Sequence, residues 1–248
     1  MKTATEHAEA ARDLAANIRK YRHGGREPLA QALAAAVAED LRDGIARRGV
    51  ALVAVSGGST PRLFFDHLAQ EPLDWSRVVI TLVDERWVPE TDERSNAAMT
   101  RRALLHNGSS RARFVPLYSG VPDPESALEE LEARVADLPL PFDAVVLGMG
   151  LDGHTASFFP GGDRLAEAID PRGAARVTSM RAEHAGEPRI TLTLPTLLAT
   201  HALYLHIEGD TKAEVLAQAL APDATAEEFP IRAVVRHAGE PVRLYWCP

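Results

Sequence analysis

The chain has 248 residues, and its 27 Lys and Arg against 35 Asp and Glu give a formal charge of −8. An apolar fraction of 46% with 25% charged residues is typical of a globular protein and excludes a disordered chain. The acidic excess argues against a nucleic-acid partner, but a small anion site with its own local cations is still compatible with it.

Several other classes of protein are excluded by what the sequence lacks. Cys247 is the single cysteine, so neither a disulfide within the chain nor a cysteine zinc site can form, and a reducing cytoplasm is the expected location. No run approaches 18 apolar residues, so no membrane span is expected. No His, Asp and Glu cluster has metal-ligand spacing, so the sequence predicts neither a metal nor another cofactor.

The amino-terminal part of the chain predicts helices. Residues 1–27 are mixed in charge and helical in pattern, and they predict an extra helix ahead of a single α/β domain over residues 28–248. After Pro28, apolar residues recur every four positions, which marks one buried face of a helix. These residues are Leu29, Leu33, Val37, Leu41 and Ile45.

Beyond this helix, strand-like and helix-like segments alternate to the end of the chain. Continuous apolar runs such as 50–55 and 144–147 favour parallel strands covered on both faces. The predicted strands are 50–55, 78–83, 114–117, 144–147, 176–180, 190–194, 203–207, 233–235 and 242–246, and the predicted helices between them are 61–69, 95–106, 124–137 and 211–220. This order predicts a layered, Rossmann-like, mostly parallel sheet flanked by helices, with binding sites at the carboxyl ends of its strands.

A glycine-rich turn follows the first predicted strand, with the sequence Ser56-Gly57-Gly58-Ser59-Thr60-Pro61. The glycines allow a tight turn and a close approach to a ligand, while Thr60 can cap the next helix and Pro61 fits its first turn. Free backbone N–H groups at the start of such a helix can bind a phosphate, and the hydroxyls of Ser59 and Thr60 can add hydrogen-bond donors. An ordinary strand–turn–helix connection uses the same residue types, so both interpretations stay open here.

Three charged residues, Asp84, Glu85 and Arg86, follow the second predicted strand. The arginine can hold an anion in bidentate fashion over the same crevice, or it can form a surface ion pair with either acid. A helix with a capping sequence then starts at Ser95-Asn96.

The segment after the strand at 144–147 carries the most chemistry. Its glycines match the G-x-G-x-x-G spacing, but the next predicted strand ends in Arg181 rather than in an acidic ribose ligand, which argues against a dinucleotide site. His154 can act as a general base near neutral pH, and Asp152 can orient its ring. A structural histidine is the competing interpretation. Arg189, at the start of a strand, and Lys212, after another, are weaker candidates for the same crevice.

Together these segments resemble the family of glucosamine-6-phosphate isomerases and 6-phosphogluconolactonases, from about residue 28 to the end of the chain. The glycine-rich turn, Asp84–Pro89, the run from Leu147 to Ser157, Arg189–Thr193 and Gly209–Ala213 come in the family's order. Arg86-Trp87 and the run Thr155–Pro160 favour the lactonase branch. The deaminase branch typically has Asp-Glu-Tyr at the second strand and Asn-Glu-Pro after the histidine. An Asn common in the lactonases is replaced near Ala199-Thr200.

The resemblance implies a fold of the phosphosugar isomerase/deaminase-like type and hydrolysis of 6-phospho-D-glucono-1,5-lactone in the oxidative pentose phosphate pathway. It implies no cofactor and a small phosphorylated sugar lactone as partner, and it leaves the oligomeric state open, with a monomer as one option. His154 would be the general base with Asp152 beside it, and amides around Gly150–Gly153 are candidate donors to the oxyanion. The implied substrate- and phosphate-binding residues are Ser56, Gly57, Gly58, Ser59, Thr60, Asp84, Arg86, Gly150, Arg189 and Lys212.

Two other functions fit the same residues. One is a phosphosugar isomerase or deaminase that uses Asp84 as its base. The other is a non-catalytic phosphosugar-binding module, against which the lack of a helix-turn-helix pattern or basic segment argues.

Overall fold

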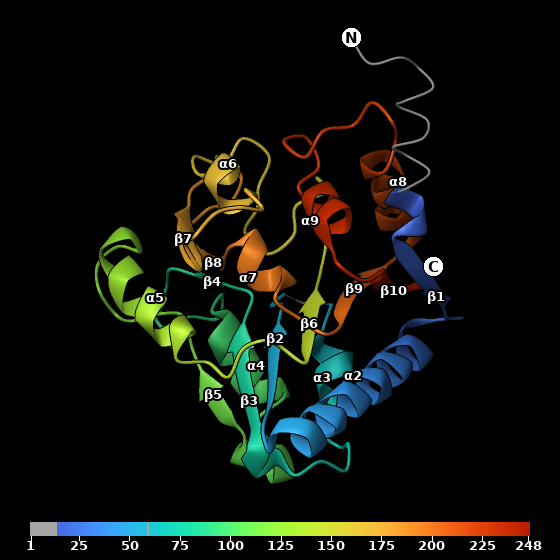
Figure 1. Ribbon diagram of the computed structural model, residues 1–248, viewed down its shortest axis with the longest axis vertical. Helices are drawn as coiled ribbons and strands as arrows, with labels where there is room; N and C mark the ends of the chain where they lie inside the picture. Colours follow the sequence, from blue (N-terminus) through green and yellow to red (C-terminus); the bar gives the residue numbers. More distant parts are fainter. Residues whose placement is uncertain (1–13, 59) are drawn as a thin grey trace.

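A seven-stranded, wholly parallel sheet forms the centre of the computed structural model, which describes residues 14–58 and 60–248 (Figure 1). Its strand order is β1-β10-β9-β6-β2-β3-β5. The strands are β1 (Ile18–Arg22), β2 (Ala51–Val55), β3 (Val78–Leu82), β5 (Arg113–Val115), β6 (Ala144–Leu147), β9 (Leu203–Glu208) and β10 (Val242–Cys247). Every residue of β2, β3 and β6 is buried, as the continuous apolar runs predicted. The predicted layered α/β fold is thereby confirmed.

Helices cover the sheet along its length. The 23-residue α2 packs on β2 and β10 and also contacts α3, and α8 packs on β9. The helices are α2 (Arg26–Arg48), α3 (Arg62–Leu68), α4 (Asn96–Ala103), α5 (Leu128–Ala136), α6 (Leu165–Ala168), α7 (Leu194–Leu198), α8 (Asp210–Ala219) and α9 (Ile231–His237), with short 3₁₀ turns at Trp75–Arg77, Asn107–Arg111 and Glu125–Ala127. Within the two described ranges, no helix is long and apolar enough to cross a membrane.

A second, three-stranded antiparallel sheet lies beside the carboxyl end of β3. It consists of β4 (Asp84–Arg86), β8 (Arg189–Leu192) and β7 (Val177–Met180), in that order. The register sets Asp84 opposite Thr191 and Arg86 opposite Arg189. The charged residues after β3 therefore belong to a short strand rather than to a loop, and the sheet fixes two arginines as neighbours.

Two sequence-based predictions are wrong. Residues 18–22 form strand β1, not part of a helix, because the segment pairs in parallel with β10, with Ile18 opposite Val242. Elsewhere in the predicted extension, residues 14–16 are helical and residues 26–27 begin α2, while residues 1–13 lie outside the described residues. The segment 233–235 is buried in helix α9 rather than in a strand, since a short apolar run alone does not distinguish the two.

Candidate active site

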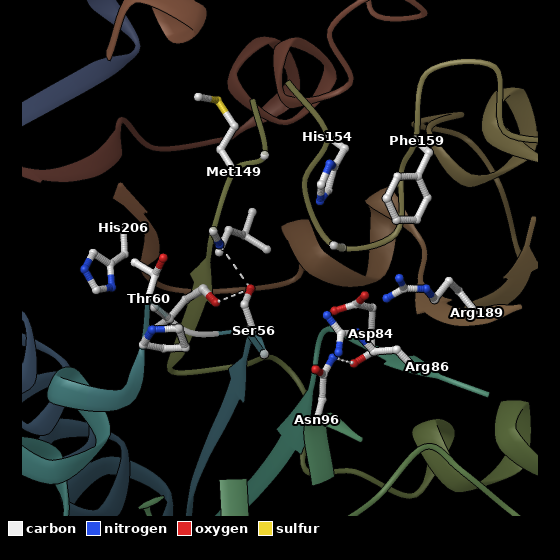
Figure 2. A pocket seen from close by; sticks show the side chains of 18 of the residues that line it. Ser56, Thr60, Asp84, Arg86, Asn96, Met149, His154, Phe159, Arg189 and His206 are labelled. Carbon is white, nitrogen blue, oxygen red and sulfur yellow. Dashed lines mark hydrogen bonds between the residues drawn. The ribbon is translucent and has the colours of Figure 1, made fainter. Parts of the chain in front are cut away.

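A cavity of about 340 Å³ opens at the carboxyl ends of β2, β6 and β9, where the parallel sheet was expected to place its ligand (Figure 2). Ten of the predicted site residues line it: Ser56, Gly57, Gly58, Thr60, Asp84, Arg86, Gly150, His154, Arg189 and Lys212. Asp152 does not line the cavity but contacts His154, and Ser59 lies outside the described residues.

The glycine-rich turn is held in place by the strands and by α4. The Ser56 hydroxyl donates to the carbonyl of Val146 at 3.0 Å and accepts the Gly148 N–H at 3.1 Å, so it joins the ends of β2 and β6. Gly57 lies so close to Asn96 that a Cβ there would come within 1.8 Å of the Asn96 Oδ1. Only a residue without a side chain permits this approach, and the turn is thereby fixed over the cavity.

Helix α3 begins differently from the sequence-based prediction. It starts at Arg62, with Pro61 as the N-terminal capping residue and no side-chain hydrogen bond at the cap. Thr60 was expected to be the cap, but it lines the cavity instead. Its hydroxyl is therefore placed to meet a ligand.

Gly57→Ala is expected to weaken binding of a phosphorylated ligand at least tenfold, because the new methyl group must displace Asn96 or the turn. Gly239→Ala is the matched control, since a Cβ at that glycine meets nothing within 4 Å. KM of each variant for the proposed substrate below, with the thermal unfolding midpoint, provides the measurement. Equal KM values for the two variants would show that the close contact between Gly57 and Asn96 does not affect ligand binding.

The three charged residues of β4 lie in different environments, and only two of them line the cavity. Glu85 is fully buried and accepts the backbone N–H groups of Arg86, Asn96 and Ala97 at 2.7–2.8 Å, so it anchors the start of α4. Burial raises the pKa of Glu85 to about 7, although these N–H donors oppose the shift. Ser95 caps α4 by accepting the Ala98 N–H, as predicted. Glu85 does not line the cavity and is a structural residue.

Asp84 and Arg86 do line the cavity. An Asp84 carboxylate oxygen accepts the Ser157 hydroxyl at 2.6 Å, and an Arg86 terminal nitrogen donates to the carbonyl of Arg94 at 2.5 Å. Within the described residues, Arg86 forms no ion pair with Asp84 or Glu85, and its buried Nε has no hydrogen-bond partner. This guanidinium has unused donors for an anion.

Arg189 lies across the small sheet from Arg86. Its guanidinium is 5.5 Å from the centre of the Phe159 ring and donates to the carbonyl of Ala185 at 2.7 Å. Burial lowers the pKa of Arg189, and the nearby charge of Asp84 partly offsets this effect. Two adjacent arginines repel each other, so an anion bound between them and the turn is favoured.

His154 and Asp152 form a close pair at the edge of the cavity. His154 Nδ1 lies 2.5 Å from an Asp152 carboxylate oxygen, which leaves Nε2 as the ring nitrogen available to a substrate. Burial tends to raise the pKa of Asp152, but the hydrogen bond and charge of His154 outweigh it and hold the pKa below its usual range. The His154 side chain is 33% exposed and its ring centre is 4.6 Å from that of Phe159.

The loop that carries this pair is tightly folded. A Cβ on Gly150 would lie 2.3 Å from the His154 ring, so the glycine makes room for the imidazole. The Gly150 N–H donates to the carbonyl of His154, and the Gly153 N–H donates to that of Gly150. These two amides already donate hydrogen bonds within the loop. This argues against their predicted role as donors to the oxyanion. Ala156, which lines the cavity, has a positive φ of 48°, a strained conformation of the kind often found at functional sites.

Four polar or aromatic residues of the cavity were not among the predicted site residues: Asn96, Phe159, His184 and His206. Figure 2 shows His206 on the side of Thr60, and His154, Phe159 and Arg189 on the opposite side. Asn96 was recognised only as the start of a helix, and His206 lies inside an apolar strand, so neither carries a sequence signal for binding.

Comparison with known proteins agrees with this geometry. The family model for glucosamine-6-phosphate isomerases/6-phosphogluconolactonase matches residues 24–246. The chain belongs to this family. Among its members, a 6-phosphogluconolactonase from Rhizobium meliloti is 53% identical over 220 residues, which are 89% of this chain and 94% of the relative. One from Pseudomonas aeruginosa is 43% identical and covers 91% of this chain and 93% of its own length.

Solved structures of the family share the fold. A crystal structure of a 6-phosphogluconolactonase from Shewanella baltica has a TM-score of 0.90 at 37% identity, covering 93% of this chain and 98% of the other. A monomeric glucosamine-6-phosphate deaminase has a TM-score of 0.75 at 20% identity, over 93% and 97% of the two chains, which is evidence for the fold alone. Both branches of the family are thus built on this architecture.

Proposed function

We propose that this chain hydrolyses 6-phospho-D-glucono-1,5-lactone to 6-phosphogluconate. It is a lactone-hydrolysing enzyme by its similarity to relatives named 6-phosphogluconolactonase. The observation that carries the assignment is one cavity lined by both a glycine-rich turn and His154, whose ring contacts Asp152. The reaction belongs to the oxidative pentose phosphate pathway, and the enzyme works in the cytoplasm.

The charge of the cavity suits a dianion. Three cations, Arg86, Arg189 and Lys212, line it against the single carboxylate of Asp84, in a chain whose formal charge is −8. This local excess of two positive charges matches the charge of a phosphate monoester near neutral pH. A volume of about 340 Å³ lies within the range of small-molecule sites. The turn and these cations hold the phosphate, which fixes the lactone carbonyl relative to His154.

His154 then acts as a general base. Its Nε2 removes a proton from a water molecule, whose oxygen attacks the lactone carbonyl carbon to form a tetrahedral oxyanion. When the oxyanion collapses, the bond to the ring oxygen breaks and the protonated imidazole gives its proton to that oxygen. Asp152 holds the ring in the Nδ1–H form and stabilises the imidazolium. The lactone is already reactive in water, so the roughly 10²–10⁴-fold effect of a general base is adequate.

The function is tested by titrating the acid released from freshly made phosphogluconolactone at constant pH, with the spontaneous ring opening subtracted. We expect the enzyme to accelerate acid release well above the spontaneous rate. Ammonia release from glucosamine 6-phosphate would instead identify a deaminase. Thermal stabilisation by phosphosugars without any turnover would identify a binding module.

Arg86→Ala is expected to raise KM by about tenfold or more and to lower kcat less, because it removes unused hydrogen-bond donors from the phosphate end of the site. Arg77→Ala is the control, since Arg77 is exposed and pairs only with Asp74 on the surface. Initial rates over a range of lactone concentrations give both constants. An Arg86→Ala enzyme with an unchanged KM would remove this arginine from substrate binding.

A further inference from the structure

A second histidine–carboxylate pair faces the same cavity. His206 Nε2, near the end of β9, lies 3.3 Å from a Glu208 carboxylate oxygen, while Arg26 of α2 contacts the other oxygen at 3.0 Å. The contact with His206 lowers the pKa of Glu208. Glu208 therefore lies between the His206 imidazole and the Arg26 guanidinium.

The His206 ring is buried, with only 2% of the residue exposed, yet it lines the cavity. Its one aromatic neighbour among the described residues is Phe64 of α3, whose ring meets it edge-on at 6.4 Å between centres. Among residues 14–58 and 60–248, none forms a hydrogen bond with the buried Nε2, and its 3.3 Å contact with Glu208 lacks hydrogen-bond geometry. Because Nε2 faces Glu208, Nδ1 is the ring nitrogen left for a ligand in the cavity.

Its surroundings are those of an anion site. Figure 2 shows His206 beside Thr60, on the side of the cavity away from His154, and Lys212 lines the same cavity. Burial lowers the pKa of Lys212, and the charge of Glu208 opposes this shift. A phosphate in this position would face Nδ1 of His206 while Glu208 faces Nε2. In a doubly protonated imidazole both nitrogens donate, so one ring can bind a carboxylate on one side and a phosphate on the other.

We propose that His206, oriented by Glu208, is a phosphate-binding residue that donates its Nδ1–H to the terminal phosphate of the substrate, beside Lys212 and Thr60. This inference rests on the proposed function and assigns the two histidines of the cavity to opposite ends of one substrate. His154 acts on the carbonyl, and His206 binds the phosphate.

The test compares three replacements of His206. Phenylalanine removes both nitrogens and keeps the packing, asparagine places an amide N–H near the position of Nδ1, and glutamine places one near Nε2. For the phosphorylated lactone we expect His206→Phe to raise KM about ten- to a hundredfold with kcat within a few-fold, as for a lost hydrogen bond to a charged group. His206→Asn should have a KM close to that of the wild type, whereas His206→Gln should have a raised KM like that of His206→Phe.

Unphosphorylated glucono-1,5-lactone distinguishes phosphate binding from packing. If His206 binds the phosphate, kcat/KM for this substrate is the same in the wild type and in His206→Phe. A general packing defect would lower kcat/KM for both lactones by a similar factor and would overturn the proposal, as would an unchanged KM for the phosphorylated lactone. His201→Phe, at an exposed histidine, is the control.

A binding measurement keeps the inference independent of catalysis. Inorganic phosphate should raise the thermal midpoint of the wild type and of His206→Asn but not that of His206→Phe. If the wild type proves inactive on the lactone, the proposed function fails while this readout still decides the role of His206. Equal phosphate stabilisation of the wild type and His206→Phe would overturn it. If His206→Phe does not fold, the contrast between the asparagine and glutamine variants decides in the same way.

Discussion

His154→Ala is expected to lower kcat for phosphogluconolactone by about 10²–10⁴-fold while leaving KM nearly unchanged. The reason is that Nε2 is the ring nitrogen left free by the contact with Asp152, and in the proposed mechanism it removes the proton from the attacking water. The proposed phosphate-binding residues lie elsewhere in the cavity, so we expect substrate binding to persist. The measurement is acid release at constant pH after subtraction of the spontaneous reaction.

Two further variants make this result interpretable. His154→Gln keeps a polar side chain of similar size against Phe159, so it separates loss of the base from loss of packing. His201→Ala replaces an exposed histidine outside the cavity and should keep the wild-type rate. A folded His154→Ala enzyme with full activity would contradict the assignment of the base.

Asp152→Asn is expected to lower kcat by roughly ten- to a hundredfold, with a smaller effect on KM, because an amide neither fixes the Nδ1–H form of the ring nor stabilises its cation. The variant should stay folded, since Asp152 is largely exposed. The same assay gives both constants.

The double variant His154→Ala/Asp152→Asn shows whether the two residues act as a unit. We expect it to be as slow as His154→Ala alone, because Asp152 acts through the ring that is missing. If the two losses multiply instead, Asp152 acts on the substrate directly.

The fold could be predicted from sequence wherever one segment carries its own signal. The four-residue period of α2 and the continuous apolar runs of β2 and β6 suffice without knowledge of their partners. Strand β1 could not be predicted, because five residues with only Ile18 buried become a strand through pairing with β10 at the far end of the chain. The charged strand β4 is likewise defined by its pairing with β8.

The same distinction applies to the site. The glycine-rich turn and His154 follow strands directly, so the rule that parallel sheets bind ligands at their carboxyl ends places them together. The contact of Gly57 with Asn96 and the presence of His206 in the cavity depend on how α4 and β9 pack, which no local pattern reports. Sequence therefore indicated that the turn and His154 share one cavity, but it did not indicate that Asn96 and His206 line the same cavity.

The central claim is that one substrate bridges the turn and His154, and a crystal structure with bound 6-phosphogluconate tests it most directly. We expect the phosphate against the backbone of Gly57 and Gly58, and the product carboxylate within about 3 Å of His154 Nε2. A product bound with its carboxylate away from His154, or bound outside this cavity altogether, would contradict the account.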